Sequence, residues 1–173
     1  MLYNRLIKTL SIISIVVIHS NSNAVSTLER TGDIVQVALP ITAGLYSITK
    51  KDSTGAKQLL FAGLSNTAVV YALKYTVNEK RPNGGKHSFP SGHTAISFVS
   101  STYMWKRYGP EFGIPATLLA GFVGYTRVEA RKHFFHDVAA GALIGMAASY
   151  FFTEKYQDNL LVTPEGVGVK FSF

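Results

Sequence analysis

Five long apolar stretches alternate with short polar turns along this chain. They cover residues 33–49, 58–73, 93–105, 112–126 and 138–153. Each stretch is long for a strand and rich in helix-forming Ala and Leu, so the pattern predicts helices. The segment Lys50–Lys57 is expected to be a polar turn between the first two. Because the other connections are also short, the predicted fold is an all-α bundle of about five core helices.

Two further patterns lie in the C-terminal part of the chain. The last apolar stretch carries Gly141 and Gly145, a pair of small residues whose spacing predicts close approach of a neighbouring helix. Apolar and polar residues then alternate from 167 to 173, after a turn at 164–166, and this is the periodicity of a strand. We therefore expect a small C-terminal β-hairpin, with residues 160–162 as its first strand.

The N-terminus has the parts of a secretory signal. Two basic residues precede an apolar run, 9–18, and small residues at Ser22 and Ala24 occupy the two positions that a signal peptidase reads. Cleavage after Ala24 would divide the chain into a signal peptide, 1–24, and one mature domain, 25–173. The alternative is an uncleaved signal anchor. In both cases the chain leaves a bacterial-type cytoplasm.

Composition narrows the class of protein. The chain is 47% hydrophobic and 16% charged, which is more apolar than a typical soluble domain. The absence of Cys excludes a disulfide framework and a thiolate metal site. The net charge of +7 is not gathered in a long basic run, so we expect no nucleic-acid partner. The sequence carries no signal for an oligomeric state.

The apolar stretches are predicted to embed the protein in a membrane. Each falls short of the roughly 20 residues that a spanning helix needs, but flanking Lys side chains can extend it by reaching the interface. If the mature N-terminus is periplasmic, the turns at 50–57 and 106–107 face the cytoplasm, and both are basic, as the orientation rule requires. The other loops then face the periplasm. The alternative is a soluble periplasmic helical domain.

The centre of the candidate chemistry is the turn 89–93, Phe-Pro-Ser-Gly-His, which leads into a helix predicted to start near His93. Free backbone N–H groups at such a turn, together with the helix dipole, favour an anion. The Ser91 hydroxyl and the Gly92 amide are expected to face the same volume. His93 lies at its edge, where it can transfer a proton.

Three cations are candidates for the same pocket. Lys74 and Arg81 are seven residues apart, so a helix that continues through Asn78 would place both on one face, and Pro82 favours a break after Arg81. An Arg fork and a Lys point charge together suit a phosphate. Arg127 is the third cation.

His133 and Asp137 are four residues apart, and on one helical face the carboxylate would hold the imidazole in one tautomer. The opposite ring nitrogen would then act as a nucleophile or base. The alternative for Asp137 is an N-cap ahead of Val138, and it can serve both purposes.

These residues resemble the three-part signature of the type 2 phosphatidic acid phosphatase superfamily. The matching segments are Lys74 to Pro82, Pro90 to His93, and Thr126 to Asp137, in this order and with the internal spacings of the family. Thr126 stands where the family commonly has Ser, which keeps the hydroxyl. The parts of the chain outside residues 74–137 are not covered by the resemblance.

The resemblance implies an all-helical, metal-independent phosphatase that works through a phosphohistidine. On this sequence it implies that His133 attacks phosphorus, Asp137 orients it and His93 protonates the leaving oxygen. It also implies a set of groups that hold the phosphate oxygens: Lys74, Arg81, Arg127, Ser91 and the Gly92 amide. Phosphoryl transfer needs mainly positioning and charge stabilisation, so the residue-level argument agrees. No metal or other cofactor is expected, and activity should survive EDTA.

The predicted function is hydrolysis of a lipid phosphomonoester or pyrophosphate on the periplasmic side of the inner membrane. The first alternative is a soluble periplasmic acid phosphatase of the same superfamily. Two weaker alternatives are a vanadate-dependent haloperoxidase-like enzyme and a non-catalytic protein that binds phosphate headgroups. Binding alone would need the cations but no nucleophile.

Overall fold

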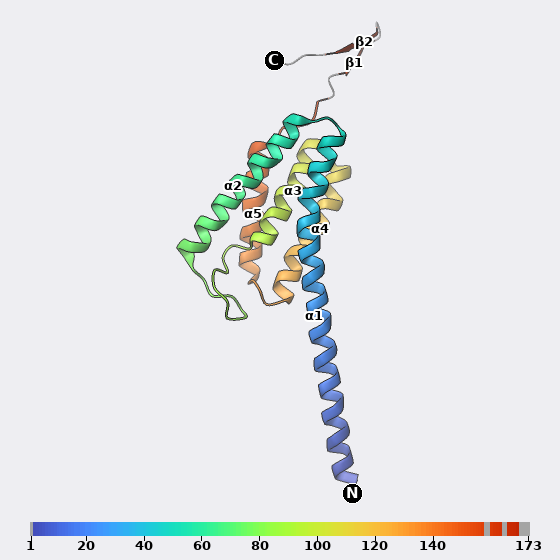
Figure 1. Ribbon diagram of the computed structural model, residues 1–173, viewed down its shortest axis with the longest axis vertical. Helices are drawn as coiled ribbons and strands as arrows, with labels where there is room; N and C mark the ends of the chain where they lie inside the picture. Colours follow the sequence, from blue (N-terminus) through green and yellow to red (C-terminus); the bar gives the residue numbers. More distant parts are fainter. Residues whose placement is uncertain (1, 158–159, 164–165, 170–173) are drawn as a thin grey trace.

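The computed structural model describes residues 2–157, 160–163 and 166–169, with side chains from residue 23 to residue 157. It confirms the all-α bundle. The helices are α1 (Leu2–Thr49), α2 (Ser53–Val77), α3 (Gly92–Tyr108), α4 (Pro110–Glu129) and α5 (Phe135–Phe152), shown in Figure 1.

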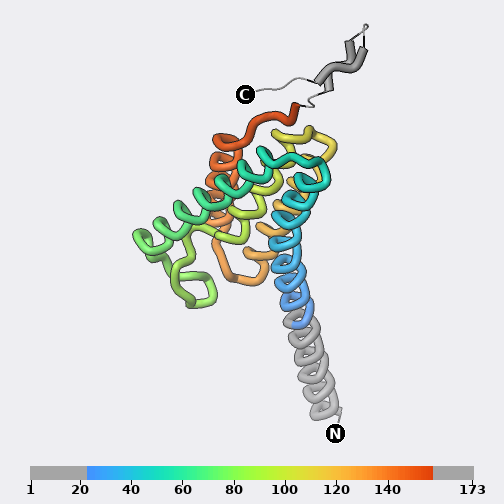
Figure 2. The backbone as a smooth tube through the Cα atoms, turned by 45° about the horizontal axis from the view of Figure 1, so that its top comes forward, coloured from blue at the N-terminus to red at the C-terminus, as the bar shows by residue number. Residues whose placement is uncertain are grey.

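Helix α3 lies at the centre of the bundle and packs against each of the other four helices, as the tube in Figure 2 also shows. Small side chains allow this packing. A Cβ atom on Gly141 or Gly145 of α5 would meet the carbonyl oxygen of Ser91 or Ala95, respectively, in and just before α3. The predicted close approach at the glycine pair is therefore confirmed, and it fixes α5 directly against the start of α3.

Helix α1 is longer than the first apolar stretch. The sequence pattern begins this segment at Asp33, but α1 continues unbroken from Leu2. Residues 19–31 are polar yet contain neither Gly nor Pro, so nothing in them interrupts a helix. The predicted cleavage point after Ala24 lies within α1, and the signal peptide 1–24 and domain 25–173 stay predictions, with the side chains of residues 1–22 outside the described part.

The predicted polar turn Lys50–Lys57 is wrong in length, because α2 already begins at Ser53. The reason is Asp52, the N-cap residue, whose carboxylate accepts a hydrogen bond from the Gly55 amide at 2.8 Å. Asp52 is itself buried and paired with Arg107 of α3, whose Nε lies 2.7 Å from Oδ2. This buried pair ties the α1–α2 turn to the end of α3.

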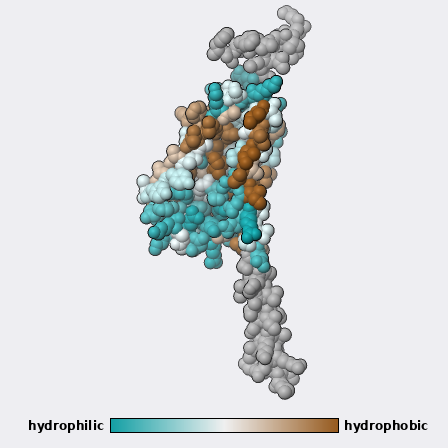
Figure 3. Space-filling view, in the orientation of Figure 1, coloured by the Kyte–Doolittle hydropathy of each residue, from teal (hydrophilic) through white to brown (hydrophobic). Residues whose placement is uncertain are grey.

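Large apolar side chains cover the outside of the helices. They form a stripe along α1 and are numerous on α2, α4 and α5, and Figure 3 shows those on the face of α1 and α2 above a hydrophilic lower end. Those on α1 are Ile34, Val37, Ile41, Leu45 and Ile48. In the described part of the chain, α5 is the helix long and apolar enough to cross a membrane by length and composition. A membrane location is thus compatible with this surface, and the signal from helix length is weak.

The two ends of the bundle carry different connections. The loops after α2 and α4 lie at one end, and the turn after α1, with Lys50 and Lys51, and the last turn of α3, with Lys106 and Arg107, lie at the other (Figure 1). Beyond α5, strands β1 (Leu160–Thr163) and β2 (Gly166–Val169) pair antiparallel. Residues 158–159, 164–165 and 170–173 lie outside the described part, so the full hairpin to Phe173 stays a prediction.

Candidate active site

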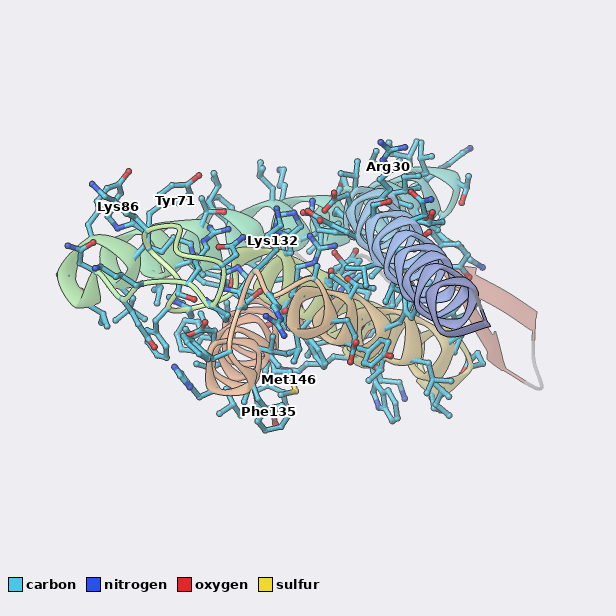
Figure 4. The ribbon with its side chains drawn as sticks, turned by 90° about the horizontal axis from the view of Figure 1, so that it is seen from below. Arg30, Tyr71, Lys86, Lys132, Phe135 and Met146 are labelled. Atoms are coloured by element: carbon cyan, nitrogen blue, oxygen red, sulfur yellow. The ribbon has the colours of Figure 1, made fainter. Side chains whose placement is uncertain are left out.

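All the candidate residues come together at the end of the bundle that carries the loops after α2 and α4. Figure 4 looks onto this end, with Lys132 of the loop after α4 near the middle. Two adjoining cavities lie here and share Arg81, His93 and His133. The central cavity, about 410 Å³, is lined by these three and by Gln36, Asn66, Thr67, Val70, Tyr71, Lys74, Gly92 and Ile96. The mouth cavity, about 240 Å³, is lined by the same three and by Glu29, Asp33, Arg127 and Lys132.

His133 and Asp137 are both buried, and they face each other across 3.4 Å between Nδ1 and Oδ2. The predicted helical face is wrong, because α5 starts at Phe135 and His133 lies in the loop before it. Asp137 is at the third position of α5, where Oδ2 accepts a hydrogen bond from the Phe134 amide at 2.9 Å. It stabilises the helix start from inside the first turn rather than as the N-cap ahead of Val138.

Ser88 completes this group and was missed by the sequence analysis. Its hydroxyl donates to Oδ2 of Asp137 at 2.5 Å and lies 3.5 Å from Nδ1 of His133. The carboxylate is thereby held from two sides while it faces the imidazole. With Nδ1 of His133 turned toward Asp137, the other ring nitrogen, Nε2, is left for chemistry in the cavity.

The environment of His133 keeps its imidazole neutral. Burial, followed by the positive charges of Arg81 and Lys74, lowers the pKa of His133 from 6.5 to about 4, against the opposing effect of Asp137. Because a neutral imidazole has a free lone pair, it is available as a nucleophile at neutral pH.

Helix α1 contributes two acidic residues to the mouth cavity, which the sequence analysis did not select. The Asp33 carboxylate lies 2.7 Å from Nη1 of Arg127 and 3.2 Å from Nε2 of His93. The Glu29 carbonyl oxygen accepts from Nη2 of Arg127 at 2.7 Å, and its carboxylate pairs with Lys132 at 3.0 Å. The sequence signal that could have identified them is a Glu and an Asp four residues apart at the start of an apolar run.

Gly32 allows this contact between α1 and α4. A Cβ atom there would collide with the Thr126 side chain and with the Arg127 guanidinium, so only a glycine lets the two helices meet at this level. Arg127 is buried, and its Nε also donates to the Thr126 hydroxyl at 3.1 Å. The hydroxyl at position 126 therefore orients the guanidinium.

The three predicted cations are held differently. Helix α2 ends at Val77, and Asn78 adopts the left-handed conformation, so Lys74 and Arg81 do not share a helical face as predicted. The loop brings them together instead. The Lys74 ammonium donates to the carbonyl oxygens of His87, Ser88 and Pro90 at 2.9, 3.3 and 2.7 Å.

Arg81 is the cation with free donors. Its Nε donates to the Lys86 carbonyl at 3.1 Å, and within the described residues no hydrogen bond engages its two Nη groups. Since Lys74 is occupied by the loop backbone and Arg127 by α1, the Arg81 guanidinium is the one best prepared to receive an anion directly.

The start of α3 is as predicted. Ser91 is the N-cap, and its buried hydroxyl pairs with that of Thr94 at 2.9 Å instead of facing the cavity. Gly92 and His93 line the central cavity, and their amides belong to the first turn, which leaves its N–H groups without a helical acceptor. The anion position expected from the turn is therefore offered by backbone amides more than by the Ser91 hydroxyl.

One set of described residues has the geometry to hold a metal ion. Glu79, His136 and Asp137 offer ligand atoms that lie within 4.8 Å of one another. His136 Nε2 is 3.0 Å from Oε1 of Glu79 and 3.2 Å from Oδ1 of Asp137. This set uses Oδ1 of Asp137, whereas His133 faces Oδ2, so the two arrangements are separate.

The chain resembles known phosphatases in sequence. The profile of the PAP2 superfamily matches residues 83–161. The lipid A 4′-phosphatase of Helicobacter pylori strain J99 is 30% identical over 142 residues, which span 75% of this chain and 71% of that protein. The chain belongs to the PAP2 superfamily. As a PAP2 protein it is a phosphoric monoester hydrolase, and the loops that gather its candidate residues lie within or beside the matched region.

Solved structures agree with this assignment. The crystal structure of Aquifex aeolicus LpxE superposes with a TM-score of 0.62 and 28% identity, covering 74% of this PAP2 protein and 82% of that chain. The phosphatidylglycerolphosphate phosphatase of Bacillus subtilis has a TM-score of 0.61 and 20% identity, covering 75% and 73%, and it supports the fold alone. A lipid A 1-phosphatase of Porphyromonas gingivalis is 35% identical to this chain over a shorter stretch of 82 residues. That stretch covers 45% of this chain and 18% of the Porphyromonas protein.

Proposed function

We propose that this protein is a membrane-embedded phosphatase that removes phosphate from a lipid phosphomonoester or pyrophosphate, through a phosphohistidine, on the periplasmic side of the inner membrane. The observation that carries the proposal is the central cavity. It joins a buried His–Asp pair and a cationic pocket to an apolar groove between helices, as described below.

The chemistry follows from the positions of three side chains. Nε2 of His133 attacks phosphorus, and the bond from phosphorus to the lipid oxygen breaks. His93 gives a proton to that oxygen, and water then cleaves the phosphohistidine while His93 takes the proton back. Asp137 acts through His133, because it holds the imidazole and stabilises the positive charge that forms on it.

The phosphate oxygens need several donors during this transfer. Arg81, the first-turn amides of α3 and the Arg127 guanidinium surround the shared part of the two cavities. Asp33 pairs with Arg127 and His93, so a phosphate bound to these two residues would replace one anion by another. Lys74 supports the pocket by holding the backbone of the 87–90 loop in place.

A lipid substrate is supported by the apolar groove. Pro40 of α1, Leu59, Leu60, Gly63 and Leu64 of α2, and Val99 of α3 line a groove of about 340 Å³, with Ala56 and Ser100. Thr67 and Ile96 line both this groove and the central cavity, so the two adjoin each other. A phosphate at Arg81 would thus have its apolar tail beside α2. The printed names of the relatives, lipid A phosphatases among them, point in the same direction.

The orientation is argued from charge. The turn after α1 carries Lys50 and Lys51, and the last turn of α3 carries Lys106 and Arg107, at the end opposite the site. Basic loops favour the cytoplasmic side, which leaves the site on the periplasmic side. The exposed apolar side chains between the two ends suit a lipid environment.

The test is a substrate panel with the purified full-length protein in mixed micelles. Phosphatidic acid, phosphatidylglycerol phosphate, undecaprenyl pyrophosphate and lipid A are compared with a water-soluble phosphomonoester. At least one lipid should have a kcat/KM more than tenfold above that of the soluble ester, because the groove adds binding energy for the tail. Equal rates would favour a non-specific acid phosphatase. Carbonate washing of membranes, which leaves an embedded protein in the pellet, tests the location separately.

A further inference from the structure

A cluster of three side chains that can ligate a metal adjoins the nucleophile, and two of its members have no part in the phosphate chemistry. Glu79 of the loop after α2 and His136 and Asp137 of α5 offer ligand atoms within 4.8 Å of one another. His136 Nε2 lies 3.0 Å from Oε1 of Glu79 and 3.2 Å from Oδ1 of Asp137. Around a tetrahedral zinc ion, whose bonds measure about 2.0–2.1 Å, neighbouring ligand atoms are about 3.4 Å apart. Small movements of the three side chains would therefore admit an ion.

The Asp137 carboxylate is the buried member of this cluster. Its side chain is fully buried, and Oδ1 has no hydrogen-bond partner among the described residues. His136 Nε2 is close to Oδ1, but it bonds to Glu79 instead, whose two carboxylate oxygens lie 3.0 and 3.2 Å away. A buried carboxylate oxygen without a partner is unfavourable. A cation held beside His136 would supply the missing partner.

Contacts outside the cluster fix the geometry of its members. Oδ2 of Asp137 accepts from the Ser88 hydroxyl and the Phe134 amide, which leaves Oδ1 on the side of His136. The His136 ring stacks on that of Phe134, with 5.3 Å between the ring centroids. The Glu79 carbonyl accepts from the Ser88 amide at 2.8 Å, which anchors the loop. Supporting contacts of this kind orient the ligands of a metal.

The donor atoms select the kind of ion. One imidazole and two carboxylates suit zinc and related divalent transition metals, whereas Mg²⁺ prefers oxygen ligands and keeps several of its waters. Two carboxylates also balance the charge of a divalent ion. The side chains of His136 and Glu79 are 57% and 30% exposed, so an ion can enter from solvent and water can complete its coordination.

We propose that Glu79, His136 and Asp137 bind a divalent ion of the zinc class, and that the bound ion slows phosphate transfer. The ion takes the place of the hydrogen on Nε2 of His136, and the ring carries its hydrogen on Nδ1. An ion on Oδ1 draws negative charge away from Oδ2, so Asp137 stabilises the positive charge on His133 less well. Binding itself is independent of the proposed function, whereas the effect on turnover rests on it. The ion is an inhibitor, and the chemistry needs no metal.

Binding is measured on the full-length protein in detergent, purified without a histidine tag and stripped of metal with EDTA. Equilibrium dialysis should show a bound Zn²⁺ that excess Mg²⁺ does not displace. Its dissociation constant should rise at least about tenfold in His136→Ala and in Glu79→Gln, because losing a ligand costs at least as much as losing a group that supports one. No bound zinc in the wild type, or an affinity unchanged in either variant, overturns the site.

His87→Ala is the matched control for binding. It removes another histidine at the same end of the bundle, one whose Nδ1 contacts the Lys74 carbonyl rather than a carboxylate. Its zinc affinity should equal that of the wild type. An equal loss of affinity in His87→Ala and His136→Ala would contradict the assignment, because the ligands would then not be specific to the cluster.

Turnover tests the inhibition. Zn²⁺ at a concentration that fills the wild-type site should lower kcat at least about tenfold, with KM little changed, a smaller loss than removal of the Asp137 carboxylate would cause. His136→Ala, which should keep most of its turnover, should lose this sensitivity at the same concentration. Equal inhibition of both proteins would mean that zinc acts elsewhere, for example on the phosphate of the substrate, and would overturn the inhibitory role.

The proposed function and the zinc site fail in different ways. If zinc binds as expected but the zinc-free protein turns over no phosphate ester, the proposed function is wrong and the binding site stands. If the zinc-free protein turns over its lipid and zinc leaves kcat unchanged, the proposed function stands and the inhibition is wrong.

Discussion

The Asp33 carboxylate lies 2.7 Å from Nη1 of Arg127, although 94 residues separate them in the sequence. Asp33 is also 3.2 Å from Nε2 of His93, so one carboxylate of α1 contacts both a proposed phosphate ligand and the proposed acid. Asp33 lines the mouth cavity together with these two residues, so it would compete with a phosphate that binds them. The positive charge of Arg127 is thus partly neutralised by a carboxylate of the same chain.

Removing this carboxylate should strengthen anion binding. In Asp33→Asn the side chain keeps its size but no longer competes for Arg127 and His93. Because the carboxylate is 47% exposed, the ion pair is worth at most about 1 kcal/mol, which corresponds to an inhibition constant for vanadate lowered about two- to fivefold. The inhibition constant is measured by titrating the purified wild type and Asp33→Asn with vanadate.

Glu29→Gln is the matched control for Asp33→Asn. It removes a carboxylate one turn earlier on α1, where the side chain pairs with Lys132 and the contact to Arg127 comes from the backbone carbonyl. Its inhibition constant should change less than that of Asp33→Asn. A weaker vanadate complex in Asp33→Asn would mean that Asp33 positions Arg127 or His93 rather than competing with the ligand.

The depressed pKa of His133 predicts the acid limb of the pH profile. Since the pKa of His133 is lowered to about 4, the imidazole is neutral above that pH and gains a proton below it, which removes the nucleophile. The acid limb of kcat/KM should therefore lie near pH 4 rather than 6.5. The folded protein should also lose stability as the pH falls from 6.5 to 4, because the unfolded chain binds this proton more tightly.

A charge variant tests the cause of this shift. Arg81 lowers the pKa of His133, so Arg81→Gln should move the acid limb to higher pH, in addition to slowing turnover. Lys80→Gln removes a neighbouring exposed charge and is the control, with its acid limb near that of the wild type. An unshifted limb in Arg81→Gln would exclude its charge as a cause.

The helices were predictable because their signals are local. Long apolar stretches, the helix that starts near His93 after the turn 89–93, and the spacing of Gly141 and Gly145 each act within a few residues, and the structure confirms them. The positions of the helix ends were less predictable. Asp52 shortens the first turn, and Asn78 ends α2 before Arg81, because capping and left-handed conformations decide the last turn more than hydrophobicity does.

The candidate site was predictable where a motif brought its residues together, and not where distant helices meet. His133 and Asp137 do face each other, although a loop and a helix start hold them rather than one helical face. Ser88, Asp33 and Asn66 enter the site only through the packing of other elements against them. The spacing of residues in the sequence does not predict at which level along its length α1 packs against α4.

The close packing of α5 on α3 predicts a sharp loss of stability at one position. In Gly145→Ala the new Cβ would meet the Ala95 carbonyl oxygen and lie 3.0 Å from the Val99 amide nitrogen. Two helix backbones must separate to accept it, at a cost of about 1–3 kcal/mol. The midpoint of thermal unfolding in detergent should fall accordingly.

Gly121→Ala is the control for this packing. Position 121 is also inside a helix, but a Cβ atom there has no neighbour within 4 Å. The substitution should raise the stability slightly, because alanine is the better helix former. Equal losses in the two variants would contradict the close contact between α5 and α3.

The last prediction separates His133 from His136, which are three residues apart and both lie beside Asp137. His133 is 3% exposed, lines both cavities and faces Oδ2 of Asp137. His136 is 57% exposed and contacts Oδ1 of Asp137 and the Glu79 carboxylate. His133→Ala should therefore abolish turnover and any acid-labile phosphoenzyme trapped from labelled substrate.

His136→Ala should keep the labelled phosphoenzyme and most of the turnover, since its imidazole lies outside both cavities. Asp137→Asn should retain a buried side chain of equal size but slow turnover by about two to four orders of magnitude, because the amide no longer stabilises the positive charge on His133. Trapping with rapid acid and alkaline quenching distinguishes the cases, as a phosphohistidine survives alkali. If the label persists in His133→Ala and disappears in His136→Ala, the nucleophile is His136, and the orientation of His133 by Asp137 serves another purpose.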